Sequence, residues 1–344
     1  MKADRLYFVE PHSVEIREQT LAPAGPDQVL VKNLYSAISA GTEMLVYRGQ
    51  LPDEMALDES LPALGKQKIE YPLQYGYAAV GRIEQVGKDV DGSWLGRTVF
   101  SFQPHGSHHV CSLDSVIPLP EEVDPKEALF LANMETAVNL VQDGNPRVGE
   151  RVVVLGQGIV GLLASSVLAH FPLADLIAAE SLEGRRTLGL QAGVHAAFDS
   201  DSASGIESLK QRLQMNESGG GADVVFELTG SPEALNLAVD LCSYSGRIVV
   251  GSWYGTKSAR INLGARFHRN RMSIVSSQVS TIAPELSGRW DKARRFSAAW
   301  EMIKSCHPAQ FISHSLPFSQ AGEAYKLLDE SPQETTQIIF DYQG

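Results

Sequence analysis

The chain is poor in cysteine. Only Cys111, Cys242 and Cys306 occur in its 344 residues, far apart and odd in number. Such a set excludes a disulfide framework and a C-x-x-C metal clip. We therefore expect buried, unreactive thiols.

Basic residues and long apolar runs are also scarce. Lys and Arg number 29 against 41 Asp and Glu, which gives a net charge of −12 at pH 7. Because phosphate binding needs clustered cations, we predict neither a nucleic acid nor a membrane as partner. No segment approaches the roughly 18 apolar residues of a membrane span, and the polar N-terminus does not resemble a secretion signal. We expect a cytoplasmic protein that binds a small-molecule substrate. With 344 residues, of which 43% are hydrophobic, the chain can bury a large core and is expected to form two domains.

The most informative stretch runs from Arg151 to Gly161, with the sequence R-V-V-V-L-G-Q-G-I-V-G. Its β-branched run predicts a strand, and the glycines with the apolar segment after them predict a tight turn and a helix. In such a turn, N–H groups at the helix N-terminus bind the pyrophosphate of a dinucleotide. The predicted contacts are Gly156, Gly158, Ile159, Val160 and Gly161.

A second predicted strand, Leu176 to Glu180, supports this interpretation. It ends in a carboxylate at about the 20-residue spacing of a ribose-binding acid. A glycine turn by itself is weak support for a dinucleotide site, because such turns occur in many folds. The alternative is an ordinary strand-to-helix turn with Glu180 as an unrelated surface acid. The carboxylate favours NAD(H), because it would repel a 2′-phosphate. Arg185 and Arg186 keep NADP(H) open, unless they form only a solvated helix face.

The hydrophobic pattern predicts an α/β protein. Residues 1 to about 130 form short, turn-separated β segments typical of a small barrel. Beyond Arg151, strands and helices alternate, which predicts a doubly wound parallel sheet of about six strands. Two of these strands end at the crevice edge where a dinucleotide lies, and their last residues are Thr229, Gly230, Gly251 and Ser252.

The segment between Tyr47 and Tyr75 contains prolines and several acidic residues. It is long enough to be a functional loop or a short helix beside a site. A plain surface excursion explains it equally well.

The order of these features resembles the medium-chain dehydrogenase/reductase superfamily, the fold of zinc alcohol and sorbitol dehydrogenases. Ser39 to Glu43 (S-A-G-T-E) is similar to the C-G-T-D turn of that family, and Tyr75 to Gly87 to its G-H-E-x-x-G-x-V-x-x-V-G stretch. Leu95 to Val99 is similar to its G-D-R-V strand. The resemblance covers nearly the whole chain.

This resemblance implies a GroES-like, β-rich catalytic domain formed by residues 1–132 and 276–344. A Rossmann dinucleotide-binding domain would span residues 133–275. The resemblance also implies a homodimer, joined at the sheet edge from Met272 to Ser276.

The same comparison leaves the catalytic zinc of the family without ligands. The zinc cysteine falls at Ala40 or Ser39, the histidine at Tyr77, the glutamate beside it at Ala78, and the next ligand at Ala132. Zinc needs thiolate, imidazole or carboxylate ligands. The four-cysteine lobe is missing as well, and we predict no zinc.

Without zinc, hydrogen-bond donors or acids must manage charge on the substrate oxygen. Tyr77 is the first candidate, because its phenol could donate to an oxyanion or protonate an enolate; a packed aromatic with a satisfied hydroxyl is the alternative. Thr42 corresponds to the proton-relay hydroxyl of the family, or it caps a turn. The resemblance brings further candidates to the same cleft, namely Glu43 and Glu135 as catalytic acids and Ser39 and Tyr47 as substrate-binding residues.

The two carboxylates have specific expectations. Glu43 corresponds to an acid behind the metal ligands, or it only pairs with a cation such as Arg269 or Arg271. Glu135 falls where the family has a small residue beside the nicotinamide, just before Thr136. Desolvation could make it an acid or base, and the alternative is an ordinary acid in the first turn of a helix.

Substrate contacts are predicted less directly. Aromatic and polar residues that could line an apolar pocket, or form ordinary core, are Phe102, Gln103, Trp253 and Tyr254. The motifs I-S-A-G-T-E and G-Y-x-x-V-G resemble the bacteriochlorophyllide dehydrogenase branch, which implies a bulky, apolar secondary alcohol. The histidines between His105 and His109 lack a nearby Cys or Asp set, so we expect them to be exposed or satisfied in the core rather than metal ligands.

Together these features predict a zinc-independent oxidoreductase that transfers a hydride between NAD, or alternatively NADP, and an alcohol or ketone. An NADPH-dependent enoyl-type reductase is one alternative. A catalytically inactive nucleotide-binding sensor or scaffold is another.

Overall fold

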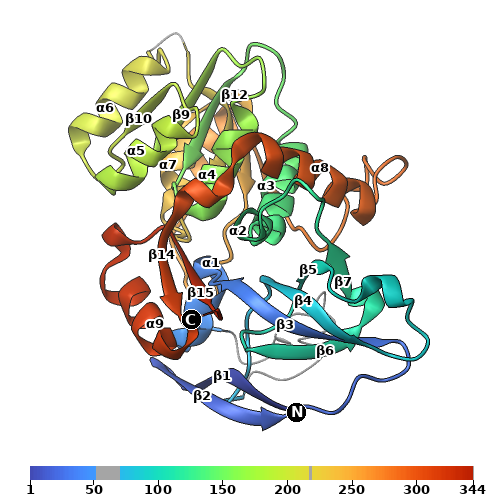
Figure 1. Ribbon diagram of the computed structural model, residues 1–344. Helices are drawn as coiled ribbons and strands as arrows, with labels where there is room; N and C mark the ends of the chain where they lie inside the picture. The colour runs from blue at the N-terminus through green and yellow to red at the C-terminus, as the bar shows by residue number, and fades with distance from the viewer. Residues whose placement is uncertain (52–69, 217–218, 344) are drawn as a thin grey trace. The chain divides into compact units, whose positions relative to one another are not determined.

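The computed structural model describes residues 1–51, 70–216 and 219–343 (Figure 1). Residues 52–69, most of the segment predicted as a loop between Tyr47 and Tyr75, lie outside the described residues. The chain divides into two compact units, Met1–Ala132 with His307–Gly344, and Asn133–Cys306.

The second boundary differs from the predicted one. The sequence-based division returned to the first domain at residue 276, whereas the structure does so at His307. The reason is tertiary packing: α8 (Lys292–Cys306) packs against α4 (Ile159–Leu168), and both helices belong to the second unit.

The first unit is built on β-strands. Within the described residues it holds a seven-stranded sheet with the order β14-β15-β3-β4-β5-β7, and β6 pairs with β3. Alternating side chains of β3 and its neighbours form an apolar cluster around Val29, Val31 and Ile83. The strands are β1 (Lys2–Glu10), β2 (Ser13–Thr20), β3 (Gln28–Ala37), β4 (Ala79–Val86), β5 (Thr98–Ser101), β6 (His108–Ser112), β7 (Val116–Pro118), β14 (Ile312–Pro317) and β15 (Gln337–Asp341).

Three helices belong wholly to this unit, counted over the described residues: α1 (Ala40–Tyr47), α2 (Pro125–Ala128) and α9 (Ala321–Glu330). α1 directly follows β3 and packs against α9. The N-terminal end of α1 is therefore fixed by elements from both ends of the chain, which matters for the side chains at Ser39 to Glu43.

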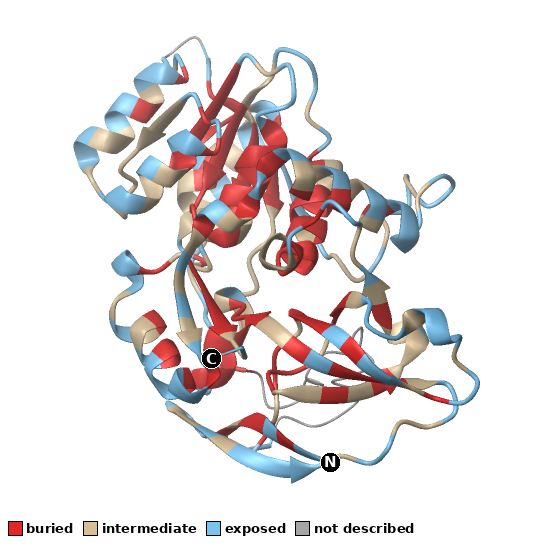
Figure 2. Ribbon diagram, viewed as in Figure 1, coloured by how far each residue is buried: buried red, intermediate tan, exposed pale blue. Residues whose placement is uncertain are grey.

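The second unit is a parallel sheet with helices. In the part of the chain that the structure describes, its order is β10-β9-β8-β11-β12-β13, and each neighbouring pair is parallel. β9 and nearly all of β8 are buried (Figure 2), as expected for strands covered on both faces. The strands are β8 (Arg151–Leu155), β9 (Asp175–Ala179), β10 (Ala196–Phe198), β11 (Ala222–Glu227), β12 (Cys242–Val250) and β13 (Ser273–Ser276).

Helices connect these strands, and sequence order reverses at β8, which lies between β9 and β11. The helices are α3 (Leu131–Gly144), α4, α5 (Glu183–Gln191), α6 (Ala203–Arg212), α7 (Ala234–Leu241) and α8. Such a switch point opens the crevice that binds ligands in doubly wound sheets. The predicted α/β fold with a doubly wound sheet is confirmed.

Two further expectations concern the thiols and membrane spans. Cys111, Cys242 and Cys306 are buried and form no disulfide among the described residues, and burial raises the pKa of the Cys111 thiol to about 11. Among the described residues, no helix has the length and apolar character needed to cross a membrane.

Candidate functional site

The glycine turn after β8 has a backbone that only glycine tolerates. Gly156 has φ +88°, and a Cβ there would lie 2.8 Å from the carbonyl oxygen of Leu228. A Cβ on Gly161 would lie 2.1 Å from the carbonyl oxygen of Gly156. Gly158 precedes α4, whose first residue is Ile159. The turn thus leaves room for a ligand at the helix N-terminus, which fits a pyrophosphate.

Glu180 directly follows β9 and is tied to this turn. Its Oε2 accepts a hydrogen bond from the backbone N–H of Gln157 at 2.7 Å, and its Oε1 accepts one from Leu182 at 2.9 Å. The residue is only 6% exposed. The structure therefore joins the predicted ribose-binding acid to the predicted pyrophosphate turn, although the two are far apart in sequence.

The two arginines of α5 have different surroundings. Arg186 donates through Nη1 to the carbonyl oxygens of Glu180 at 2.9 Å and Ser181 at 2.6 Å, so it stabilises the turn after β9. The Nη1 of Arg185 lies 4.0 Å from the place a Cβ would take on Gly158. Arg185 is therefore the arginine beside the glycine turn.

A buried carboxylate that the sequence analysis missed organises the ends of β11 and β12. Glu227 is fully buried and accepts hydrogen bonds from the N–H of Thr229 at 2.8 Å and from the hydroxyl of Tyr254 at 2.5 Å. The N–H of Gly230 donates to Ser252 Oγ at 2.9 Å. Burial, and then the Glu227 carboxylate, raise the pKa of Tyr254. Glu227 is the last residue of β11 and stands two positions before Thr229, and this place at a strand end was the sequence signal that could have identified it.

The hydroxyl of Tyr254 is therefore bound to a carboxylate. This polar contact is not what we expect of a residue that only lines an apolar pocket. Trp253 beside it is half-buried. In the first unit, Phe102 and Gln103 are also half-buried, and the ring of Phe102 contacts that of Phe100 edge to face at 5.0 Å. Each pair lies in its own unit, so the structure does not establish one pocket wall from the four residues.

Three hydroxyls meet at the start of α1 in the first unit. The hydroxyl of Tyr77 is hydrogen-bonded to Ser39 Oγ and, at 3.2 Å, to Thr42 Oγ1. Ser39 is the residue before α1, and Thr42 lies in its first turn. Tyr77 and Thr42 are half-buried, so this hydroxyl cluster, Ser39, Thr42 and Tyr77, can reach a ligand as well as its own members.

Glu43 has its hydrogen-bond partners within the first unit, so they do not include a cation such as Arg269 or Arg271, one of the two alternatives for this carboxylate. Both arginines are exposed and belong to the second unit. Glu43 is fully buried; its Oε1 accepts from the N–H of Ser39 at 2.7 Å, and its Oε2 accepts from His105 Nε2 at 2.9 Å. The hydroxyl of Tyr325 donates to the same Oε2.

Tyr47 is a packed aromatic rather than a free substrate contact. It is 6% exposed, and its ring stacks on that of Tyr325 at 5.5 Å. Burial, followed by the charge of Asp329, raises the pKa of its hydroxyl. Its prediction as a substrate-binding residue finds no support in this packing.

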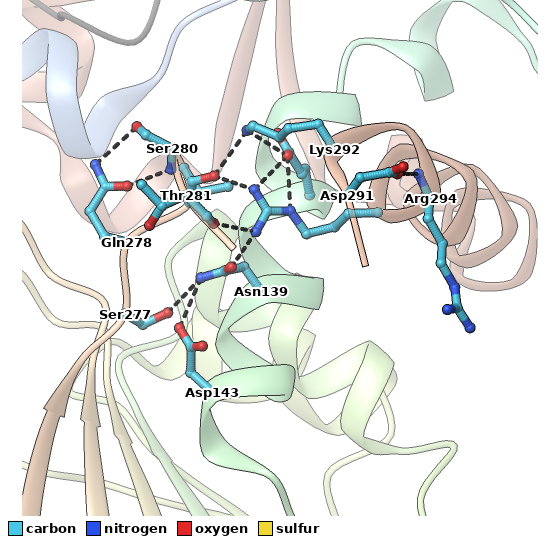
Figure 3. A network of polar contacts seen from close by, with 12 residues as sticks. Asn139, Asp143, Ser277, Gln278, Ser280, Thr281, Asp291, Lys292 and Arg294 are labelled. Atoms are coloured by element: carbon cyan, nitrogen blue, oxygen red, sulfur yellow. Dashed lines mark hydrogen bonds and ion pairs between the residues drawn. The ribbon is translucent and has the colours of Figure 1, made fainter. Parts of the chain in front are cut away.

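Glu135, for which an acid or base role and an ordinary first-turn acid were the two alternatives, lies beyond the first turn of α3 and is paired with two cations. Its Oε1 accepts from Lys292 Nζ at 2.8 Å and from Arg295 Nε at 3.0 Å (Figure 3). Two cations therefore hold the carboxylate inside the second unit. The neighbouring Thr136 is half-buried.

The histidines of the run at 105–109 have protein partners. His105 Nδ1 is hydrogen-bonded to Ser36 Oγ at 2.7 Å, and His109 Nε2 to Ser101 Oγ at 3.0 Å. Over residues 1–51, 70–216 and 219–343, no three His, Cys, Asp or Glu side chains are grouped to hold a metal ion. The zinc positions occupied by Ala40, Tyr77, Ala78 and Ala132 do not supply zinc ligands either.

Comparisons with known proteins agree with this fold. Residues 160–299 match the family model described as zinc-binding dehydrogenase. D-guloside 3-dehydrogenase of Escherichia coli K12 is 24% identical over 329 residues, covering 91% of this chain and 92% of that protein.

Solved structures are similar over the whole chain. L-idonate 5-dehydrogenase of E. coli K-12 has a TM-score of 0.80 at 16% identity, with 99% of both chains covered. A protein of E. coli CFT073 described as a short chain alcohol dehydrogenase, solved with NADH, has a TM-score of 0.78 at 18% identity, again covering 99% of both chains. The prediction of an NAD(P)-dependent oxidoreductase is confirmed, and residues 160–299 are similar to the zinc-binding dehydrogenases.

Proposed function

We propose that this protein is a zinc-independent, NAD(H)-linked oxidoreductase that interconverts a secondary alcohol and a ketone. The observation that carries the proposal is the hydroxyl cluster of Ser39, Thr42 and Tyr77. Tyr77 takes the position at which the resemblance implies the zinc histidine, and Ser39 is one of the two positions, with Ala40, that correspond to the zinc cysteine. Hydroxyls cannot replace zinc as a Lewis acid, but they can donate to an oxygen on which negative charge develops.

The division of labour in the reaction follows from this chemistry. When bound, a nicotinamide supplies or accepts the hydride. Tyr77 donates a hydrogen bond or a proton to the substrate oxygen during reduction and accepts the proton during oxidation. Ser39 and Thr42 orient the Tyr77 hydroxyl. Glu43 in turn fixes Ser39 through the backbone N–H at 2.7 Å.

The cofactor preference rests on Glu180 and on the glycine turn. A buried carboxylate at the end of β9 can accept from ribose hydroxyls and disfavours a 2′-phosphate, so we propose NAD(H) as the preferred cofactor. Arg185 beside Gly158 leaves NADP(H) as the alternative.

For the substrate, we propose a secondary alcohol and retain two chemical classes. The resemblance to the bacteriochlorophyllide dehydrogenase branch favours a bulky, apolar molecule. The relative named D-guloside 3-dehydrogenase favours a carbohydrate derivative. A substrate panel must therefore contain both classes.

We further propose a homodimer formed through β13. This edge strand has exposed apolar side chains, with Ile274 at 37% and Val275 at 38% exposure. An unpaired, partly apolar edge is suited to pairing with a second copy. Light scattering during gel filtration tests this: a mass near twice 37.4 kDa supports the dimer, and a monomer contradicts it.

Stopped-flow oxidation of NADH and NADPH against panels of ketones, ketoses and enones tests the proposed function. We expect turnover with ketones, and Tyr77→Phe should lower kcat by about 100-fold with little change in NADH affinity, because one general acid contributes roughly that much. Tyr244→Phe, at a tyrosine that is 68% exposed, is the matched control. Turnover of enones alone would favour the enoyl-type reductase, and nucleotide binding without any turnover would favour a sensor or scaffold.

A further inference from the structure

Arg295 is a fully buried arginine near the start of α8 in the second unit. Figure 3 shows the polar network around it, with Asn139 of α3 and Lys292 of α8 among the labelled residues. Its Nε donates to Glu135 Oε1 at 3.0 Å, and its Nη1 donates to Asn139 Oδ1 at 2.5 Å. Its remaining donors reach backbone: Nη1 donates to the carbonyl oxygen of Thr281 at 2.8 Å, and Nη2 to that of Val279. One guanidinium thus connects two helices to one short segment of irregular chain.

The segment in question, Ser277 to Thr281, is held at both ends. Lys292 adds a second cation, with Nζ 2.9 Å from the carbonyl oxygen of Val279 and 2.8 Å from Glu135 Oε1. At the other end, Asn139 Nδ2 donates to Ser277 Oγ at 2.9 Å. Glu135 and Asn139 are four residues apart and therefore share one face of α3.

The segment begins at the ligand-binding edge of the sheet. Ser277 follows the last residue of β13, and its N–H donates to the carbonyl oxygen of Val250 at the end of β12 at 2.9 Å. The glycine turn after β8 and Glu180 after β9 lie at the same carboxyl edge, because all these strands are parallel.

The strand order then separates the two halves of a dinucleotide. β9 lies on one side of β8, and β11, β12 and β13 follow on the other. A dinucleotide with its pyrophosphate at the glycine turn and its adenosine ribose at Glu180 must extend its other nucleotide over the ends of β11 to β13. The segment Ser277 to Thr281 lies on that side.

We propose that Arg295 and Glu135 are positioning residues that hold Ser277 to Thr281 as a contact for the nicotinamide half of the cofactor. This inference rests on one part of the proposed function, namely that the protein binds a nicotinamide dinucleotide. A buried ion pair costs desolvation free energy that apolar packing would avoid, so stability alone is a poor reason for it. Geometry is a better reason, since the rigid fork of arginine reaches two carbonyl oxygens and two side chains at once.

Arg295→Lys tests this, because lysine keeps the charge but has no planar fork. The dissociation constants of NADH and of ADP-ribose, which lacks the nicotinamide, are measured by fluorescence and calorimetry. We expect NADH binding to weaken by about tenfold and ADP-ribose binding to stay within about twofold, since the charged hydrogen bonds that fix the segment contacting the nicotinamide half are lost. Glu135→Gln should show the same pattern. Lys304→Met, which removes a cation of α8 that pairs with Glu301 instead, should change neither.

Unchanged NADH affinity in folded Arg295→Lys protein would overturn the inference. An equal loss of affinity for NADH and ADP-ribose would overturn it too, because it would show a general disturbance of the unit. If Arg295→Lys does not fold, Lys292→Met serves instead, since this side chain is 45% exposed and also contacts Val279. It should weaken NADH alone by about threefold, as expected for a single lost charged contact. Wild-type protein that binds neither NADH, NADPH nor ADP-ribose would contradict the proposed function itself.

Discussion

Glu43 and His105 form a fully buried carboxylate–imidazole pair, with Oε2 and Nε2 2.9 Å apart. His105 is anchored on its other side by Ser36, and Glu43 holds the N–H of Ser39 at the start of α1. The pair therefore connects the interior of the first unit to the hydroxyl cluster proposed to manage the substrate oxygen.

Removing the imidazole should destabilise this unit. His105→Ala leaves Glu43 Oε2 with one donor fewer and exposes Ser36 to a cavity. We expect the free energy of unfolding to fall by about 2–3 kcal/mol, the range for a lost hydrogen bond to a charged buried group. Urea denaturation of His105→Ala and of His268→Ala, at an exposed histidine, provides the comparison. A loss no larger than that of His268→Ala would contradict the interpretation.

A second buried histidine should make stability depend on pH. Burial, followed by the charges of Arg5 and His108, lowers the pKa of His109 from 6.5 to about 3. Below pH 6.5 the unfolded chain binds a proton at this site that the folded protein does not. The free energy of unfolding should therefore fall as the pH falls from 6.5 towards 3, by up to about 1.4 kcal/mol per pH unit from this group.

His109→Gln isolates that contribution, because glutamine does not titrate and can still bond to Ser101. Urea unfolding at pH 7 and pH 5 should show a pH dependence smaller than that of the wild type by about 2 kcal/mol. His268→Gln, at an exposed site, should leave the dependence unchanged. An identical dependence in wild type and His109→Gln would show that the pKa of His109 is the same in the folded and unfolded states, which would contradict the prediction.

The parts of the fold set by local sequence were predictable. The strand, glycine turn and helix from Arg151 to Gly161 follow from residues that are neighbours in the chain, and the structure has β8, the turn and α4 there. Glu180 was identifiable because the spacing from a glycine turn to the next strand end is fixed by the length of one connecting helix.

Contacts between distant residues were not predictable. Glu43 pairs with His105, which lies 62 positions away, and with Tyr325, which lies 282 positions away. Glu135 pairs with Arg295 across 160 positions. Each carboxylate has cations that lie nearer to it in the sequence. The packing of α1 on α9 decides the partners of Glu43, and the placement of α8 decides the partner of Glu135. The functional interpretation of both acids changed for this reason.

The preference between NAD and NADP should respond in opposite directions to substitutions at Glu180 and at Arg185. Glu180→Gln removes the charge and keeps one side-chain oxygen, which can accept from the N–H of Gln157 or from that of Leu182 but not from both. We expect KM for NAD to rise by about tenfold, because a charged hydrogen bond to ribose becomes a neutral one, while KM for NADP rises less. Arg185→Ala should raise KM for NADP more than KM for NAD, since the guanidinium can clamp a 2′-phosphate that NAD lacks. Steady-state kinetics give KM for NAD and KM for NADP in each variant. Arg186→Ala removes the other arginine of α5, which is bound to backbone carbonyls, so it separates an effect of lost charge from an effect of the position beside the glycine turn. If Glu180→Gln raised both KM values equally, Glu180 would support the turn and would not select the cofactor.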